Sequence, residues 1–220
     1  GYCAVDNPES ADLIIINTCA VRKKPEDKVA SLLGKYEILK KEKKDLIIAI
    51  AGCMIQQEEV AAYIKNRFHY VDLIFGTFAL PRLPQLISEA RLNKGTLLAI
   101  EEDYSTDREG LPIKHSHAFK AWLPVIYGCN NYCTYCVVPY VRGRERSRSA
   151  TKIISEAQSL ASRGYLEITL LGQNVNSYGN DLIEETSFAM LLSDLNQIEG
   201  IKRIRFMTSH PKDLSLDLIE

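Results

Sequence analysis

The sequence lacks the features that mark several large classes of protein. Its longest apolar runs, such as Leu46–Ala51, are far shorter than the roughly 20 residues of a membrane-spanning helix, so we expect no membrane association. Neither charge dominates: 27 Lys and Arg against 28 Asp and Glu leave a net charge of −1, and any nucleic-acid site would need a local basic patch. With 46% hydrophobic and 25% charged residues, the composition excludes disordered, collagen-like and disulfide-dense proteins.

Cysteine is scarce, but three of the six cysteines are clustered as Cys129-x3-Cys133-x2-Cys136. No secretory signal opens the chain, and in such proteins cysteine clusters are more often metal ligands than disulfides. We therefore expect a reducing, cytoplasmic setting. The chain does not begin with Met, and we expect it to be a piece of a longer protein.

The first ninety residues alternate apolar runs with segments of helical spacing. The predicted strands are Asp12–Asn17, Asp45–Ala51 and Tyr70–Phe75, and the predicted helices are Glu26–Lys44, Gln56–Phe68 and Leu83–Leu92. This pattern predicts an α/β domain over residues 1–92, with helices packed on a parallel sheet. Cys19 and Cys53 each follow a predicted strand, so we expect both at the carboxyl edge of the sheet, where open α/β sheets bind ligands. Two buried structural cysteines are the alternative.

The periodicity fades over residues 93–119, which predicts a linker. His115 and His117 lie in this segment, and with no third ligand nearby we expect them to be solvated. From residue 120 the alternation resumes, with predicted strands Leu123–Tyr127, Leu166–Leu171 and Arg203–Met207. Since a three-stranded parallel sheet would leave an open edge, residues 120–220 are predicted to be the first part of a truncated (βα)n partial barrel.

The cysteine cluster follows the first of these strands. Three thiolates can hold three irons of a [4Fe–4S] cluster and leave the fourth iron open to a ligand. A zinc knuckle is the alternative, but it needs a fourth protein ligand.

Several sequence blocks resemble one enzyme family. The loop Gly128-Cys-Asn-Asn-Tyr-Cys-Thr-Tyr-Cys136 resembles that of the radical S-adenosylmethionine (SAM) superfamily. Within it, the chain is similar to the methylthiotransferase family, closest to the branch that makes 2-methylthio-N6-isopentenyladenosine in tRNA. The other blocks that carry this resemblance are Asn17–Arg22, Ala51–Cys53, Phe75–Thr77, Val137–Arg148, Leu171–Gly179 and Thr208–Pro211.

The resemblance implies two [4Fe–4S] clusters and SAM as cofactors. Cys129, Cys133 and Cys136 would hold the SAM-binding cluster, with Tyr135 matching an aromatic residue that the superfamily places there. Cys19 and Cys53 would hold an auxiliary cluster, whose third ligand is expected upstream of residue 1. A radical derived from SAM would then activate C2 of adenosine 37 in the anticodon stem-loop, with electrons from a donor such as a flavodoxin or ferredoxin. No catalytic residue is assigned beyond the clusters.

Two further groups of residues are expected near this site. Gln173, Asn174 and Ser209 follow barrel strands and are therefore predicted to contact SAM or the adenine; a turn rich in Asn and Gly without a binding role is the alternative. Alternate arginines are expected to share one face of an extended loop and to bind RNA phosphates or SAM carboxylates, unless they form a solvated surface. These are Arg142, Arg144, Arg146 and Arg148.

Two other functions remain open at this stage. The substrate could instead be threonylcarbamoyladenosine in tRNA, which a related branch of the family methylthiolates. The chain could also be a non-enzymatic iron–sulfur or zinc scaffold.

Overall fold

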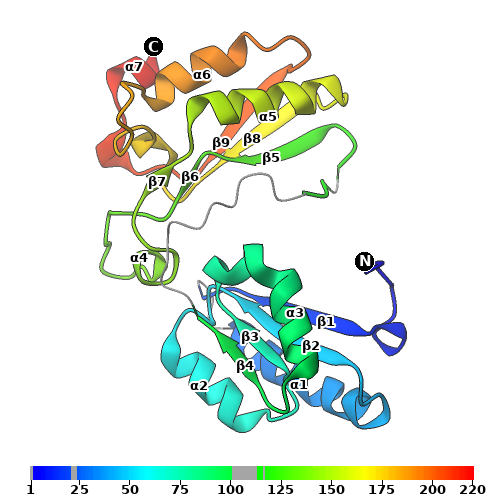
Figure 1. The fold of residues 1–220 in the computed structure, drawn as a ribbon. Coiled ribbons are helices and arrows are strands. Elements are labelled where there is room, and N and C mark those ends of the chain that lie inside the picture. Colours follow the sequence, from blue (N-terminus) through cyan, green and yellow to red (C-terminus); the bar gives the residue numbers. More distant parts are fainter. Residues whose placement is uncertain (1, 21–23, 101–112, 116) are drawn as a thin grey trace. The chain divides into compact units, whose positions relative to one another are not determined.

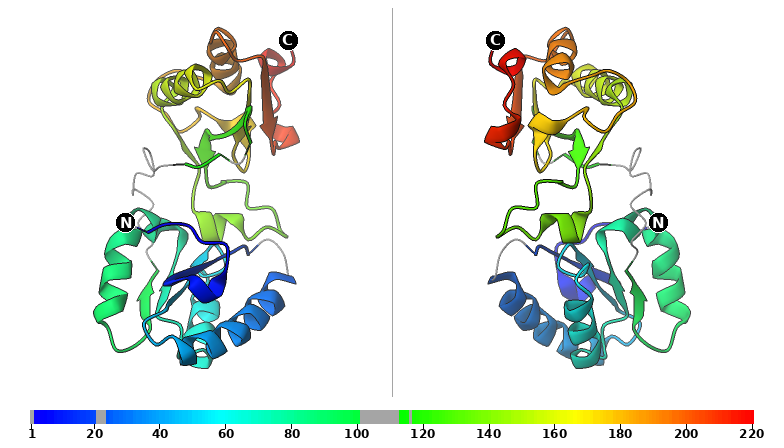
Figure 2. Two further views of the ribbon diagram at one scale, coloured as in Figure 1. Left: turned by 90° about the vertical axis from the view of Figure 1, so that its right-hand side faces the viewer. Right: turned by 90° about the vertical axis from the view of Figure 1, so that its left-hand side faces the viewer.

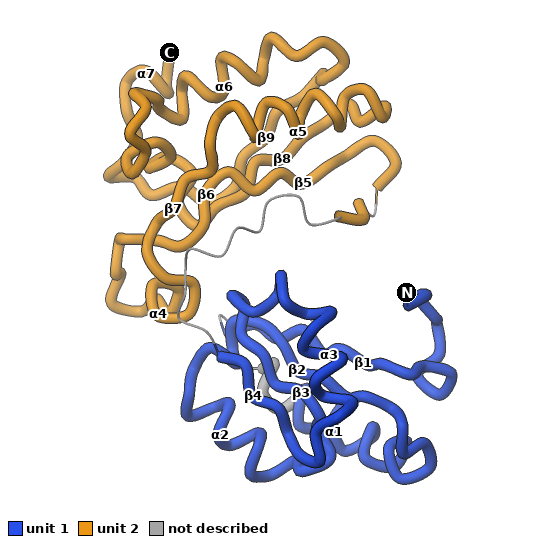
Figure 3. Tube along the Cα trace, in the orientation of Figure 1, with its two compact units in different colours: residues 1–111 blue, residues 112–220 orange. Residues whose placement is uncertain are grey.

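The computed structural model divides the chain into two compact units, residues 1–111 and 112–220 (Figure 3). It describes residues 2–20, 24–100, 113–115 and 117–220 (Figure 1). Among these residues, no helix has the length and apolar character needed to cross a bilayer. The division falls inside the segment expected to be a linker. Each unit is built on its own parallel sheet.

Unit 1 contains a four-stranded sheet in the order β1-β2-β3-β4, with every neighbouring pair parallel. The strands are β1 (Leu13–Thr18), β2 (Ile47–Gly52), β3 (Leu73–Phe75) and β4 (Leu97–Ala99). The helices are α1 (Lys24–Glu42), α2 (Glu58–Arg67) and α3 (Leu83–Leu92), with short 3-10 turns η1 (Pro8–Ser10) and η2 (Thr77–Arg82).

The central strand of unit 1 is buried on both faces, which explains its continuous apolar sequence. Ile48 and Ile50 point to the face covered by α1 and α2, whereas Ile47 and Ala49 point to the face covered by α3. Figure 2 shows α1 and α3 on opposite sides of the sheet. The predicted α/β domain is thus confirmed, with helices on both faces.

Unit 2 contains a three-stranded parallel sheet in the order β5-β8-β9 and an antiparallel pair β6-β7. The strands are β5 (Lys120–Pro124), β6 (Ile126–Tyr127), β7 (Arg146–Ser147), β8 (Glu167–Leu171) and β9 (Arg203–Met207). The helices are α4 (Val138–Arg142), α5 (Ala150–Ser162), α6 (Phe188–Asn196) and α7 (Leu216–Ile219), with 3-10 turns η3 (Val175–Ser177) and η4 (Pro211–Asp213). In Figure 1, α5 and α6 cover the same face of the sheet, which is the arrangement expected for part of a (βα)n barrel.

Apart from the exact bounds of elements, the structure differs from the predicted fold in the segments around residues 97, 115 and 124. The linker prediction is wrong at its start, because residues Leu97–Ala99 pair with β3 as β4. The predicted strand Leu123–Tyr127 is two strands, since β5 ends at Pro124, a residue that cannot donate a backbone hydrogen bond. The ring of His115 lies edge-on to Tyr165 at 5.2 Å between centroids, so His115 is packed rather than solvated.

Candidate functional site

The carboxyl edge of the unit 2 sheet gathers three loops. Pro124, Leu171 and Met207 are aligned across β5, β8 and β9, so the segments that follow them leave the sheet on the same side. The cysteine cluster follows β6, just beyond the end of β5. The predicted placement of the cysteine loop behind the first barrel strand is therefore confirmed.

Backbone contacts fix the start of the cysteine loop. Gly128 has a φ of 69°, and a Cβ atom there would lie 2.0 Å from the Arg144 carbonyl oxygen. The next residue, Cys129, donates its backbone N–H to the Gly143 carbonyl at 3.1 Å. Only glycine combines this left-handed conformation with so close an approach of two backbones. The residues at both ends of the segment 128–144 are thereby held together.

Two of the thiols of this loop, those of Cys133 and Cys136, lie near the third, Cys129. All three are free, with Cys129 buried and Cys133 and Cys136 partly exposed. Burial raises the pKa of Cys129, and the nearby Glu145, Cys136 and Cys133 raise this pKa further, against a backbone hydrogen bond from Asn131. Among the described residues, no three His, Cys, Asp or Glu side chains converge on the position of a single metal ion. In a [4Fe–4S] cluster each cysteine binds a different iron, so three separate thiols on one loop fit that group.

Cys19 and Cys53 lie next to each other at the carboxyl edge of the unit 1 sheet. They directly follow Thr18 and Gly52, which are partners in the β1–β2 register. The backbone N–H of Ala20 donates to the Cys53 Sγ at 2.9 Å. Gly52 has a φ of 110°, and a Cβ atom there would lie 2.1 Å from the Thr18 carbonyl oxygen. The structure thus brings these two cysteines to adjacent strand ends, as the sequence predicted.

The other residues predicted to bind the cofactor fall into two groups. Tyr135 is 90% exposed, and Ser209 is exposed just after β9, so both side chains are accessible. Gln173 is partly buried, and its Nε2 lies 3.3 Å from the Gly172 carbonyl oxygen. Asn174 is buried and its amide is bonded to two other residues, so it does not offer a free side chain to a ligand.

The four arginines do not share one face. Arg148 is 7% exposed, and its guanidinium donates to the Pro124 carbonyl at 2.6 Å and to Glu156 at 2.7 Å. The prediction of an RNA-binding role is therefore wrong for Arg148, which instead connects the end of β5 to the middle of α5. Arg144 is exposed, and Arg142 and Arg146 are partly exposed. The alternation fails because α4 ends at Arg142 and a left-handed Gly143 follows it.

The sequence reasoning missed two residues of this region. Glu145 lies close enough to Cys129 to raise its pKa, and its position inside the segment Val137–Arg148 was the available signal. Asp213 bonds the Asn174 side chain at 2.6 Å, and no local pattern marks it.

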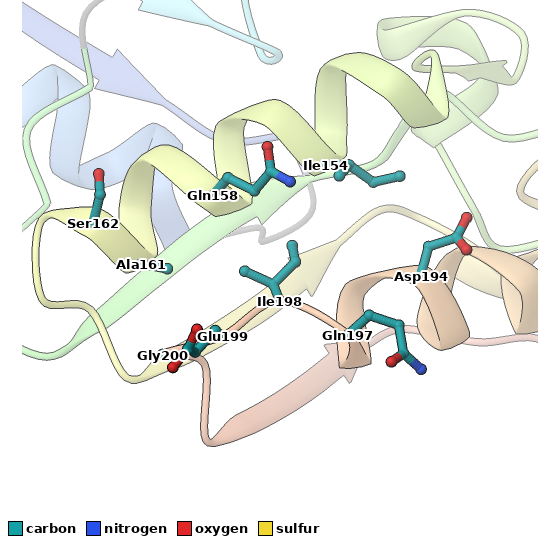
Figure 4. Close-up of a pocket in the computed structure, with 9 residues that line it drawn as sticks. All are labelled: Ile154, Gln158, Ala161, Ser162, Asp194, Gln197, Ile198, Glu199 and Gly200. Carbon is teal, nitrogen blue, oxygen red and sulfur yellow. The ribbon is translucent and has the colours of Figure 1, made fainter.

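One pocket of unit 2 lies away from these loops (Figure 4). It has a volume of about 750 Å³ and is lined by α5, the end of α6 and the turn before β9. Its polar lining includes Gln158, Asp194 and Glu199, and none of the predicted site residues is among its lining residues. Because that turn leads into β9, the pocket lies toward the amino edge of the sheet, opposite the cysteine loop.

Both the N-terminal and the C-terminal part of the chain match a known protein family. Residues 1–76 match the family described as "Uncharacterized protein family UPF0004", and residues 123–220 match the radical SAM superfamily. The chain is 51% identical over 219 residues to a tRNA-2-methylthio-N(6)-dimethylallyladenosine synthase of Thermoanaerobacter sp. (strain X514), covering the whole chain and 46% of that protein. Proteins of the same name from Pelotomaculum thermopropionicum and Clostridium botulinum are 52% and 50% identical, and the chain covers 49% of each. The chain thus spans about half the length of the curated relatives it matches.

Among solved structures, the chain is similar to the radical S-adenosylmethionine methyltransferase TsrM from Kitasatospora setae. The TM-score is 0.49 at 16% identity, over 76% of this chain and 38% of that one.

Proposed function

Since this chain belongs to the radical SAM superfamily and carries an N-terminal UPF0004 domain, we propose that the protein is a methylthiotransferase that modifies tRNA. Its reaction would add a methylthio group to C2 of N6-isopentenyladenosine at position 37. The observation that carries this proposal is the free Cys129-x3-Cys133-x2-Cys136 loop at the carboxyl edge of a partial (βα)n sheet. Relatives with 50–52% identity over the whole chain carry the corresponding name.

The cysteines divide into two ligand sets. Cys129, Cys133 and Cys136 would hold the [4Fe–4S] cluster that binds SAM, and Cys19 and Cys53 would supply two ligands of an auxiliary [4Fe–4S] cluster. When bound, the clusters and SAM supply the radical chemistry that an adenine C2–H bond needs, because that bond is not acidic enough for a general base. The protein's own part is to hold the thiols at fixed strand ends, through the backbone contacts at Gly128 and Gly52.

Exposed side chains around the cysteine loop suit an RNA substrate. Tyr135 would lie against SAM, and Arg144, with Arg142 and Arg146, would contact tRNA phosphates. A flavodoxin or ferredoxin would supply electrons. Free cysteines and a tRNA substrate both favour a cytoplasmic location.

The test uses the full-length protein purified without oxygen. Iron and sulfide analysis should find about eight irons per protein, as two [4Fe–4S] clusters require. Cys133→Ala should abolish the formation of 5′-deoxyadenosine from SAM. The double variant Cys19→Ala/Cys53→Ala should keep that cleavage without tRNA but form no methylthio product, while Cys3→Ala, which changes an exposed thiol, serves as the control.

Mass spectrometry of tRNA nucleosides identifies the product. Methylthiolated isopentenyladenosine is expected, whereas methylthiolated threonylcarbamoyladenosine would contradict the proposed substrate. Bound zinc without iron would contradict the proposal as a whole.

A further inference from the structure

One buried side chain bonds the loop after β8 to the loop after β9. Asn174 is 1% exposed. Its Oδ1 accepts the backbone N–H of His210 at 2.9 Å, and its Nδ2 donates to Asp213 Oδ2 at 2.6 Å. The side-chain oxygen and the side-chain nitrogen of Asn174 are therefore both bonded to the segment after β9. A ligand could not reach this side chain unless the two loops separated.

Two further bonds join the same loops, and they surround a strained residue. Val175 donates its backbone N–H to the Thr208 carbonyl at 2.9 Å, and the Thr208 hydroxyl donates to the Gly172 carbonyl at 2.6 Å. Thr208 has a φ of 65°, a conformation that β-branched residues very rarely adopt. Such strain persists only where surrounding contacts hold it, and it concentrates at functional sites.

We propose that Asn174 is a positioning residue for the cofactor site. With Asp213 it holds the turn Thr208–His210 in its strained conformation, and so it fixes the exposed Ser209 at the carboxyl edge of the sheet. This inference rests on the proposed function, because it takes SAM as the ligand bound at that edge. It replaces the direct contact of Asn174 with SAM or the adenine that the sequence predicted.

The chemistry of the pair allows a sharp substitution. Asn174→Asp would place a carboxylate against the carboxylate of Asp213, and the attraction at 2.6 Å would become repulsion. Asp213→Asn alone keeps a bond between two amides. In the double variant Asn174→Asp/Asp213→Asn, the carboxylate at position 174 accepts hydrogen bonds from the His210 N–H and from the amide N–H at position 213. Both bonds are restored, and the negative charge lies at position 174 instead of 213.

The test measures hydrogen exchange and SAM binding on the full-length protein with these three variants. Exchange is followed at the backbone amides of Val175 and His210 before the clusters are loaded, and SAM affinity is measured by calorimetry after they are loaded. Asn180→Asp is the matched control, since Asn180 is exposed and lies in the same loop.

We expect Asn174→Asp to speed exchange at both amides and to weaken SAM binding, each at least tenfold. The double variant should return both quantities to within about threefold of the wild type, and Asp213→Asn and the control should change little. Weak SAM binding in the double variant, with normal exchange, would show that the Asn174 amide touches SAM and would overturn the proposal. Unchanged exchange in Asn174→Asp would overturn it as well. A wild type that does not bind SAM would contradict the proposed function, while the exchange rates would still decide whether the pair holds the turn.

Discussion

Substituting Gly128 by alanine should loosen the cysteine loop, and two separate effects contribute. The φ of 69° places an alanine in the left-handed region, which costs about 1–2 kcal/mol. The added Cβ would also lie 2.0 Å from the Arg144 carbonyl oxygen and 2.5 Å from that of Gly143, so the backbone must shift, at about 1–3 kcal/mol. We therefore expect Gly128→Ala to destabilise unit 2 by about 2–5 kcal/mol.

Two other glycines separate these effects. Gly164 has a φ of 87° with nothing within 4 Å of an added Cβ, so Gly164→Ala should cost only the left-handed penalty of about 1–2 kcal/mol. Gly34 lies in helix α1 of unit 1, also with open space around it, and Gly34→Ala should leave unit 2 unchanged.

The assay is urea unfolding followed by tryptophan fluorescence. Trp122 is the single tryptophan of the chain and lies in β5, so its signal reports on unit 2. Iron content after anaerobic reconstitution gives a second readout, because a shift of Gly143 and Arg144 would move the cysteine loop. Equal losses for Gly128→Ala and Gly164→Ala, with full iron in both, would refute the argument from the close backbone approach.

Four further outcomes follow from the side chains of unit 2. Arg148→Gln should lower the free energy of unfolding by about 2 kcal/mol, since it removes two bonds of a buried guanidinium. Arg144→Gln should leave unfolding unchanged but reduce the salt dependence of tRNA binding by roughly one unit of slope; an unchanged slope would make Arg144 a solvated residue. Burial raises the pKa of Glu167, but neighbouring Arg and Lys side chains outweigh this and hold the pKa below 4.5. The wild type should therefore lose stability as the pH falls below about 4.5. In urea unfolding measured over a pH series, Glu167→Gln should reduce this loss. Tyr178→Phe should lower the free energy of unfolding by about 1 kcal/mol, because the buried hydroxyl donates to the Arg148 carbonyl at 2.8 Å. Burial raises the pKa of Tyr178 to about 12, so the wild type should lose stability as the pH rises from about 10 to 12, and Tyr178→Phe should not show this loss.

The fold was predictable where a segment has one strong pattern. The bounds of α3 and β9 agree with the sequence, and the parallel sheets follow from apolar strands separated by helices. β4 was missed because three residues are too short to show a period. The split of β5 from β6 depends on a proline at the end of an apolar run.

The candidate site was predictable to the extent that it depends on strand ends. Cys19 and Cys53 lie at one edge because any parallel sheet places its strand ends together. The predictions for Arg148 and Asn174 were wrong for a different reason. Each side chain is held by hydrogen-bond partners that are distant in the sequence, and no local pattern predicts them. Pro124 lies 24 positions before Arg148, and Asp213 lies 39 positions after Asn174.

The position of β9 at the edge of the unit 2 sheet affects the solubility expected for the protein. β9 pairs with β8 on one side, and no described strand pairs with its other side. An open edge of this kind can pair with another molecule, so concentrated solutions of this chain are at risk of aggregation. Arg203 and Arg205 lie on this strand and oppose such pairing by charge, although both also bond Glu167. Because both arginines also hold the nearly buried Glu167 carboxylate, a change that neutralises them should lower the stability of unit 2 as well as its solubility.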